Sequence, residues 1–133
     1  MSQSEQSSIH QEVTIKASPQ RVYDALTTAK EFSAFTGGAP AEIDPTPGGA
    51  FSGFSGMILG RNIELVQNQR VVQAWRVANW NPGVYSIAKF ELHADGSGTR
   101  LVFDQAGFPA DQFEHLAPGW HKMYWEPLKK YLG

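Results

Sequence analysis

Hydrophobic and polar positions alternate along much of the chain. Near the N-terminus, Ile9, Val13 and Ile15 fall on one face of a predicted strand. The alternation is clearest at Phe90 and Leu92, which point inward between polar neighbours. Because one face is apolar and the other polar, we expect an antiparallel sheet with one solvated face. Turn-forming Gly, Pro and Asn residues separate the predicted strands, which cover residues 9–15, 50–55, 57–66, 71–79, 84–93 and 99–105.

Two short helices are predicted after the first strand. Ser18 is a suitable N-cap residue, and Pro19 suits the first helical position because it needs no hydrogen-bond acceptor there. A second helical piece carries Phe32 and Phe35 and ends at Gly37.

After residue 113 the apolar spacing changes to three- and four-residue steps, which predicts an amphipathic helix. We expect Pro118 to begin its main part and Pro127 to bend it. Trp120 lies on the apolar stripe, where truncation to alanine would be costly. Trp125 lies one position off that stripe and is predicted to be a tolerant surface residue. The stripe consists of Phe113, Leu116, Trp120, Met123, Tyr124, Pro127, Leu128 and Tyr131.

Length and composition indicate one soluble domain. The 133 residues are typical of a single domain, which we place at 9–133 after a disordered tail at 1–8. The formal charge of -2 provides no basic stripe for nucleic acid. The chain has no Cys, which excludes thiol catalysis and thiolate metal sites. Its longest aliphatic run, residues 57–59, is too short for a membrane span, so we expect a cytoplasmic protein.

Aromatic residues are abundant, with 8 Phe, 4 Trp and 4 Tyr. They fit either a filled aromatic core in a curved β protein or a cavity with an aromatic lining. Composition alone favours the filled core.

Several segments resemble one known family. Residues 17–26, Ala-Ser-Pro-Gln-Arg-Val-Tyr-Asp-Ala-Leu, resemble the opening of the START-like (SRPBCC) superfamily. The segments that match its middle and its closing helix are residues 48–51, 56–60, 70–76, 119–120 and 127–132. Together they are similar to the branch of homologues of the heat-shock-protein-90 ATPase activator.

This resemblance implies an α+β helix-grip fold, in which a curved antiparallel sheet of six to seven strands wraps around the C-terminal helix and encloses a cavity. Superfamily members bind lipids, hormones or polyketides, and some catalyse cyclisation. Co-chaperone members join this domain to a separate chaperone-binding module, which these 133 residues do not include. We therefore expect a small hydrophobic molecule as the partner in preference to a chaperone, with no cofactor and no metal. A homodimer stays open.

The inward parity of the strands and the helix stripe predict the ligand-lining residues. They are Phe35, Phe51, Ile63, Trp75, Val77, Phe90, Leu101, Phe103, Gln105, Trp120 and Tyr124. Gln105 brings a buried amide that needs a partner. Arg61 shares the parity of Ile63, so it would face the cavity and select an anionic ligand, unless a bulge near Gly60 turns it outward.

Two other functions remain as alternatives. A cyclase or hydratase-like enzyme could use Gln105, Asn79 or Tyr124 together with cavity water, although the sequence shows no acid–base pair. The four histidines also lack the spacing of a helical metal site. A client- or chaperone-interaction module would instead present an exposed apolar patch in place of an enclosed cavity.

Overall fold

The computed structural model describes residues 8–133, so the predicted tail lies outside the described residues except for Ser8, which begins the first strand. The strands are β1 (Ser8–Ile15), β2 (Glu42–Ile43), β3 (Ala50–Gly53), β4 (Ile58–Val66), β5 (Arg70–Val77), β6 (Ser86–Asp95) and β7 (Gly98–Ala106). The helices are α1 (Pro19–Thr27), α2 (Ala29–Phe35), α3 (Phe113–Trp120) and α4 (Glu126–Leu132). Short turns of helix, η2 (Phe54–Gly56), η3 (Ala110–Gln112) and η4 (His121–Trp125), complete the set.

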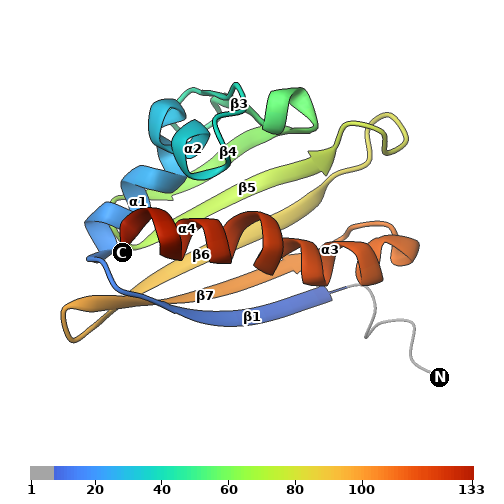
Figure 1. The fold of residues 1–133 in the computed structure, drawn as a ribbon. Coiled ribbons are helices and arrows are strands. Elements are labelled where there is room, and N and C mark those ends of the chain that lie inside the picture. Colours follow the sequence, from blue (N-terminus) through green and yellow to red (C-terminus); the bar gives the residue numbers. More distant parts are fainter. Residues whose placement is uncertain (1–7) are drawn as a thin grey trace.

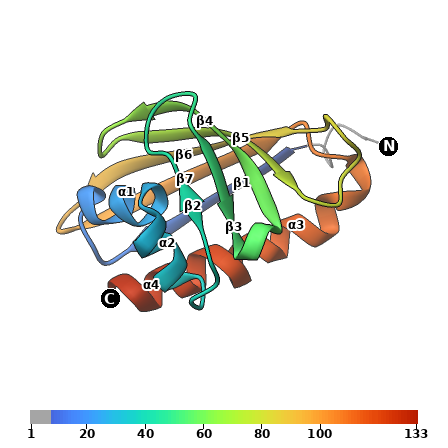
Figure 2. The same cartoon turned by 90° about the horizontal axis from the view of Figure 1, so that it is seen from above.

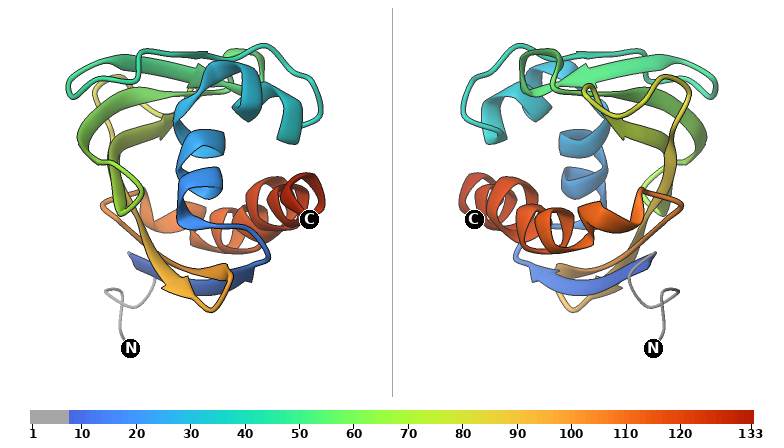
Figure 3. Two further views of the ribbon diagram at one scale, coloured as in Figure 1. Left: turned by 90° about the vertical axis from the view of Figure 1, so that its left-hand side faces the viewer. Right: turned by 90° about the vertical axis from the view of Figure 1, so that its right-hand side faces the viewer.

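All seven strands form one antiparallel sheet in the order β1-β7-β6-β5-β4-β3-β2. The first strand joins the last because its apolar residues continue the inner face, with Val13 opposite Leu101 and Ile9 opposite Gln105. The sheet curves around α1 and the C-terminal helix (Figure 1, Figure 3). The predicted α+β helix-grip fold is therefore confirmed. The two-residue strand β2 was too short for periodicity to indicate.

Both predicted helices after β1 are present; α1 begins as the sequence predicts, and α2 ends at Phe35, two residues before the predicted Gly37. Pro19 occupies the first turn of α1, and the Ser18 hydroxyl accepts a hydrogen bond from the Arg21 amide at 3.3 Å. Phe32 and Phe35 of α2 are both buried, and their side chains pack against the C-terminal helix through Tyr124.

The C-terminal helix is continuous from α3 through η4 to α4, and Pro118 lies inside α3 instead of beginning it. Five of its buried residues recur in steps of four: Leu116, Trp120, Tyr124, Leu128 and Leu132. Four residues of an α-helix overshoot one turn by about 40°, so these positions would drift around the helix. In the wider π turn η4, the Glu126 amide donates to the His121 carbonyl five residues back. This wider turn offsets the drift, so the buried positions stay on the side of the sheet.

The same π turn corrects the prediction for Trp125. Its side chain is fully buried, whereas Met123, which the stripe placed inside, is 45% exposed. The Trp125 ring nitrogen donates to Gln11 Oε1 on β1 at 2.7 Å. The Gln11 amide in turn donates to the Ala117 carbonyl at 2.8 Å, so one side chain of β1 holds two points of the helix.

A bulge in β4 changes which side chains face inward. Asn62 pairs with Gln73 and Glu64 with Val72, which leaves Ile63 as an extra residue. Ile63 is consequently 48% exposed, and the prediction that it faces the interior is corrected. Arg61 points outward and donates to the Gly48 carbonyl at 3.0 Å. It does so because the inner positions of this strand are even-numbered before the bulge.

Aromatic rings fill the space between the sheet and the C-terminal helix. The ring centroids of Phe103 and Trp120 are 4.2 Å apart, and those of Trp120 and Tyr124 are 4.3 Å apart. Phe90 lies against Phe103 at 5.1 Å and against Trp125 at 6.1 Å. Of the two interpretations of the aromatic excess, the filled core describes most of this interior.

Candidate functional site: an apolar cleft beside the C-terminal helix

A cleft of about 220 Å³ opens between the C-terminal helix and the end of the sheet nearest η2. Nearly every residue around it is apolar. The sheet side contributes Phe54, Met57, Ile58, Trp75 and Val77, and the helix contributes His115, Leu116, Gly119, Trp120, Met123 and Tyr124. Met57 and Met123 stand at its mouth with 60% and 45% of their surface exposed. Figure 2 shows β2 and β3 above the helix at this end of the molecule.

The wall on the sheet side is a strained turn. Phe54, Ser55 and Gly56 follow one another with positive φ angles of 53°, 59° and 87°. A side chain with a β-carbon costs about 1–2 kcal/mol in this left-handed region, and Phe54 is an aromatic residue. Hydrogen bonds from the Ser55 amide to the Pro40 carbonyl and from the Met57 amide to the Phe54 carbonyl hold the turn. The turn places Phe54 and Met57 beside the cleft. Strained backbone of this kind is concentrated at functional sites in proteins.

The floor of the cleft is held by hydrogen bonds that cross between helix and sheet. The Trp120 ring nitrogen donates to Gln105 Oε1 at 2.8 Å. The Gln105 amide donates to the Ser86 hydroxyl at 3.0 Å, and this hydroxyl donates to the Trp75 carbonyl at 2.8 Å. The Trp75 ring nitrogen donates to the Tyr124 hydroxyl at 3.4 Å. The inner amide of Gln105 therefore positions Trp120 and does not reach the cleft.

Four of the eleven predicted lining residues meet at the cleft: Trp75, Val77, Trp120 and Tyr124. Five others, Phe51, Phe90, Leu101, Phe103 and Gln105, are buried in the core. Phe35 instead lines a neighbouring groove, and Ile63 lies on the surface for the reason given above.

Sequence reasoning missed Phe54, Met57, His115 and Met123 at the rim of the cleft. The left-handed turn that presents Phe54 has no sequence signature apart from Gly56. Met123 was recognised as apolar, but the π turn that moves it outward was not foreseen.

The cleft offers few groups for acid–base chemistry. Burial raises the pKa of the Tyr124 hydroxyl far above its usual range, so it stays protonated. Asn79, the third residue of the enzyme alternative, lies exposed beyond the end of β5. Within residues 8–133, no group of three or more His, Asp or Glu side chains is arranged to hold a metal ion.

A second, wider groove of about 600 Å³ adjoins the cleft. It runs between α2 and the second half of the C-terminal helix, and it shares Phe54 and Met123 with the cleft. Its lining includes Lys122, Glu126 and Lys130, which follow one another at four-residue steps along one face of the helix. The two hollows therefore border one another at Phe54 and Met123.

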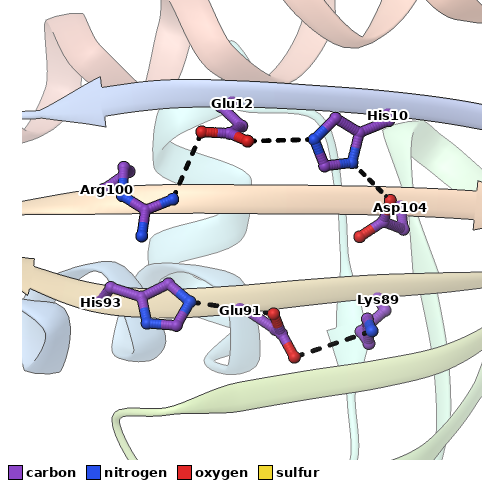
Figure 4. Close-up of polar contacts among 7 residues, drawn as sticks. All are labelled: His10, Glu12, Lys89, Glu91, His93, Arg100 and Asp104. Carbon is purple, nitrogen blue, oxygen red and sulfur yellow. Dashed lines mark hydrogen bonds and ion pairs between the residues drawn. The ribbon is translucent and has the colours of Figure 1, made fainter.

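The opposite face of the sheet is charged. Across β1 and β7, His10 lies 2.6 Å from Asp104 and 3.0 Å from Glu12, and Arg100 lies 3.3 Å from Glu12 (Figure 4). On β6, Glu91 lies 3.7 Å from Lys89 and 3.8 Å from His93. These exposed ion pairs form rows along the sheet, and none of their residues lines the cleft.

Comparisons with known proteins agree with this fold. Residues 16–133 match the family described as "Activator of Hsp90 ATPase homolog 1-like protein". The chain belongs to this family. Its helix-grip domain is 30% identical over 120 residues to the human activator of 90 kDa heat shock protein ATPase homolog 1, and 32% identical over 115 residues to a Dictyostelium discoideum homologue. These matches cover 90% and 86% of the chain but only 35% and 30% of the relatives, so the chain spans about a third of their length.

Solved structures are also similar to this chain over nearly their whole length. A crystal structure of an HSP90 activator from Plasmodium falciparum superposes with a TM-score of 0.91 at 27% identity, covering 96% of both chains. No helix within residues 8–133 is long and apolar enough to cross a membrane.

Proposed function

We propose that this chain binds a 90 kDa heat-shock protein and stimulates its ATPase, with the apolar cleft as the contact surface. The likeness to the Plasmodium activator carries the proposal, because it extends over 96% of both chains. The protein described as an HSP90 activator in that structure thus has the same fold as this chain over nearly its whole length. This likeness counts against the sequence-based preference for a small molecule over a chaperone.

The form of the cleft supports a protein partner. Apolar pockets for small molecules usually measure about 300–1,000 Å³ and enclose most of the ligand. A cavity of about 150 Å³ binds benzene, so the 220 Å³ here suits one large apolar side chain of a partner. Met57 and Met123 at the mouth add flexible, polarisable side chains of the kind common on adaptable protein-binding surfaces.

Isothermal titration calorimetry of the chain with a 90 kDa heat-shock protein, together with the ATPase rate of that chaperone, tests the proposal. We expect binding and an increased ATPase rate for the wild-type chain, and a loss of both for the double variant Met57→Asp/Met123→Asp. Ile63→Asp is the matched control, since Ile63 is 48% exposed, between Met123 at 45% and Met57 at 60%, but lies outside the cleft. A wild-type chain that neither binds nor stimulates the chaperone contradicts the proposal, as does an equal loss in the control.

A second candidate function is binding of a small apolar molecule in the same cleft. The indole rings of Trp75 and Trp120, which line the cleft with an angle of 38° between their planes, favour this candidate because aromatic rings pack well against apolar ligands. Native mass spectrometry of freshly purified protein tests it: a retained small molecule whose release follows Trp120→Ala supports this function. A bare polypeptide mass leaves the chaperone as the preferred partner.

A further inference from the structure

The two adjoining hollows along the C-terminal helix, together called the groove below, have two chemically different ends. The end around Trp75 and Leu116 is apolar, and the other end carries Lys122 and Lys130. Phe54 and Met123 belong to both hollows and mark the point where the ends meet. From Leu116 to Lys130 the helix covers about 20 Å, which corresponds to about six residues of extended chain.

The lysines at the basic end have no recorded ion-pair partner among the described residues. Among residues 8–133, the structure records no ion pair for Lys122, Lys130 or Glu126. The opposite wall, at Ala34, Phe35, Thr36 and Gly37, carries no charged side chain. The lining of this end therefore holds two lysines against one glutamate, which gives it a net positive charge. Outside the lining, the Glu31 carboxylate on α2 accepts a hydrogen bond from the Tyr131 hydroxyl at 3.4 Å.

We infer that the groove binds an extended segment of the partner that places an apolar side chain in the cleft and carboxylates beside Lys122 and Lys130. This inference deepens the proposed function and rests on it for the identity of the partner. The apolar anchor gains affinity from area removed from water. The carboxylates fix the direction of the segment, because charge complementarity favours one orientation over its reverse. A segment with lysines in the same positions is repelled.

The strained turn fits this role. Phe54 and Ser55 would relax if the turn left the left-handed region, but then Phe54 and Met57 would no longer line the groove. The hydrogen bond from Ser55 to Pro40 keeps the wall in place before a partner arrives. Such a preformed wall lowers the ordering cost of binding.

Methyl NMR of methionine-labelled protein tests the groove directly. The chain has only 3 methionines, and two of them, Met57 and Met123, line the groove. The probe is a synthetic peptide of about ten residues, with leucines at one end and glutamates at the other, made in both chain directions. We expect the Met57 and Met123 signals to shift on titration. A peptide with lysines in place of the glutamates should bind about tenfold more weakly.

Charge-reversed variants separate this inference from the proposed function. The double variant Lys122→Glu/Lys130→Glu should bind the acidic peptide and the 90 kDa heat-shock protein about fivefold more weakly, or weaker still. The matched control Lys129→Glu, on the same helix but outside the groove, should bind both as the wild type does. A chaperone that binds the double variant as tightly as the wild type overturns the inference and leaves the proposed function standing. Peptide-induced shifts without chaperone binding support the groove's chemistry and overturn the proposed partner. An absence of shifts at Met57 and Met123 overturns the inference.

Discussion

Three of the four tryptophans connect the C-terminal helix to the sheet through their ring nitrogens. Trp120 donates to Gln105 on β7, Trp125 to Gln11 on β1, and Trp75 on β5 to Tyr124 on the helix. Each indole thus combines a large buried area with a hydrogen bond that requires one orientation. At the scale of the residue, these contacts determine how the helix is rotated over the sheet.

Alanine substitutions measure this rotation. Trp120→Ala and Trp125→Ala should each lower the free energy of unfolding by about 3–5 kcal/mol, because both rings are buried and leave cavities. Met123→Ala, on the exposed side of the same helix, should cost less than about 1 kcal/mol. Urea unfolding gives all three values. A Trp125→Ala variant as stable as Met123→Ala would mean that the helix is rotated away from the described position.

Alternation along the strands predicted most buried residues, including Phe90, Leu101 and Phe103. It failed at Ile63, because a bulge adds one residue to one strand and reverses the parity beyond it, without any required change in residue type. Gln11 could have been found: it shares the inward parity of Ile9 and Val13, and an inward amide needs a partner.

At the scale of the element, the C-terminal helix has free space beside Gly119. A β-carbon added there would meet nothing within 4 Å, and this glycine lines the cleft. Alanine has a higher helix propensity than glycine by about 1 kcal/mol.

Gly119→Ala should therefore raise the free energy of unfolding by about 0.5–1 kcal/mol. It should also weaken the binding of the chaperone, because the added methyl group narrows the cleft. Thermal unfolding and calorimetric titration of the same preparation measure the two effects. Gly60→Ala is the contrasting variant, because its β-carbon would collide with the Ala74 carbonyl in β5, and it should be strongly destabilised. A more stable Gly119→Ala that binds the chaperone as tightly as the wild type would argue against the cleft as the contact surface.

The edge strand β1 carries a pH-dependent contact with β7. Asp104 and Glu12 bond to His10 and raise its pKa above the ordinary value of 6.5, while His10 and Arg100 lower the pKa of Glu12. The contribution of His10 is therefore present below about pH 6.5 and lost as the pH rises through its raised pKa. The contribution of Glu12 is present above its ordinary pKa of 4.5 and lost in acid.

His10→Ala should accordingly reduce stability more at about pH 5.5 than at about pH 8.5. The effect is small in size because the pair is solvent-exposed. NMR titration gives the pKa of His10 directly, and Asp104→Asn should lower it. A His10 that titrates at or below 6.5 in the wild-type chain would contradict this contact.

Elements with local signals were predicted well. Ser18 and Pro19 located the start of α1, and the change of period located the C-terminal helix. Pro118 was expected to begin the main helix because proline is tolerated in the first turn of a helix. The helix α3 instead begins five residues earlier, at Phe113. The π turn arises because residues four apart must stay buried although they drift around an α-helix. The sequence could not predict this turn, since the surface that buries these residues is the folded sheet.

At the scale of the whole molecule, the two faces of the sheet differ in chemistry. The helix side offers the apolar cleft and its basic extension, and the outer side carries rows of paired charges (Figure 4). The fold followed from the sequence because it is encoded by periodicity along the whole chain. The site did not, because it depends on one strained turn and one helix irregularity that bring Met57 and Met123 to the same opening.

Hydrogen exchange with mass spectrometry, recorded for the chain alone and with a 90 kDa heat-shock protein, tests the central claim most directly. We predict new protection at residues 54–58 and along 115–131, the two sides of the groove, with little change on the outer face at 87–93 and 100–106. Protection confined to the outer face, or no protection anywhere at saturating chaperone, would contradict the account.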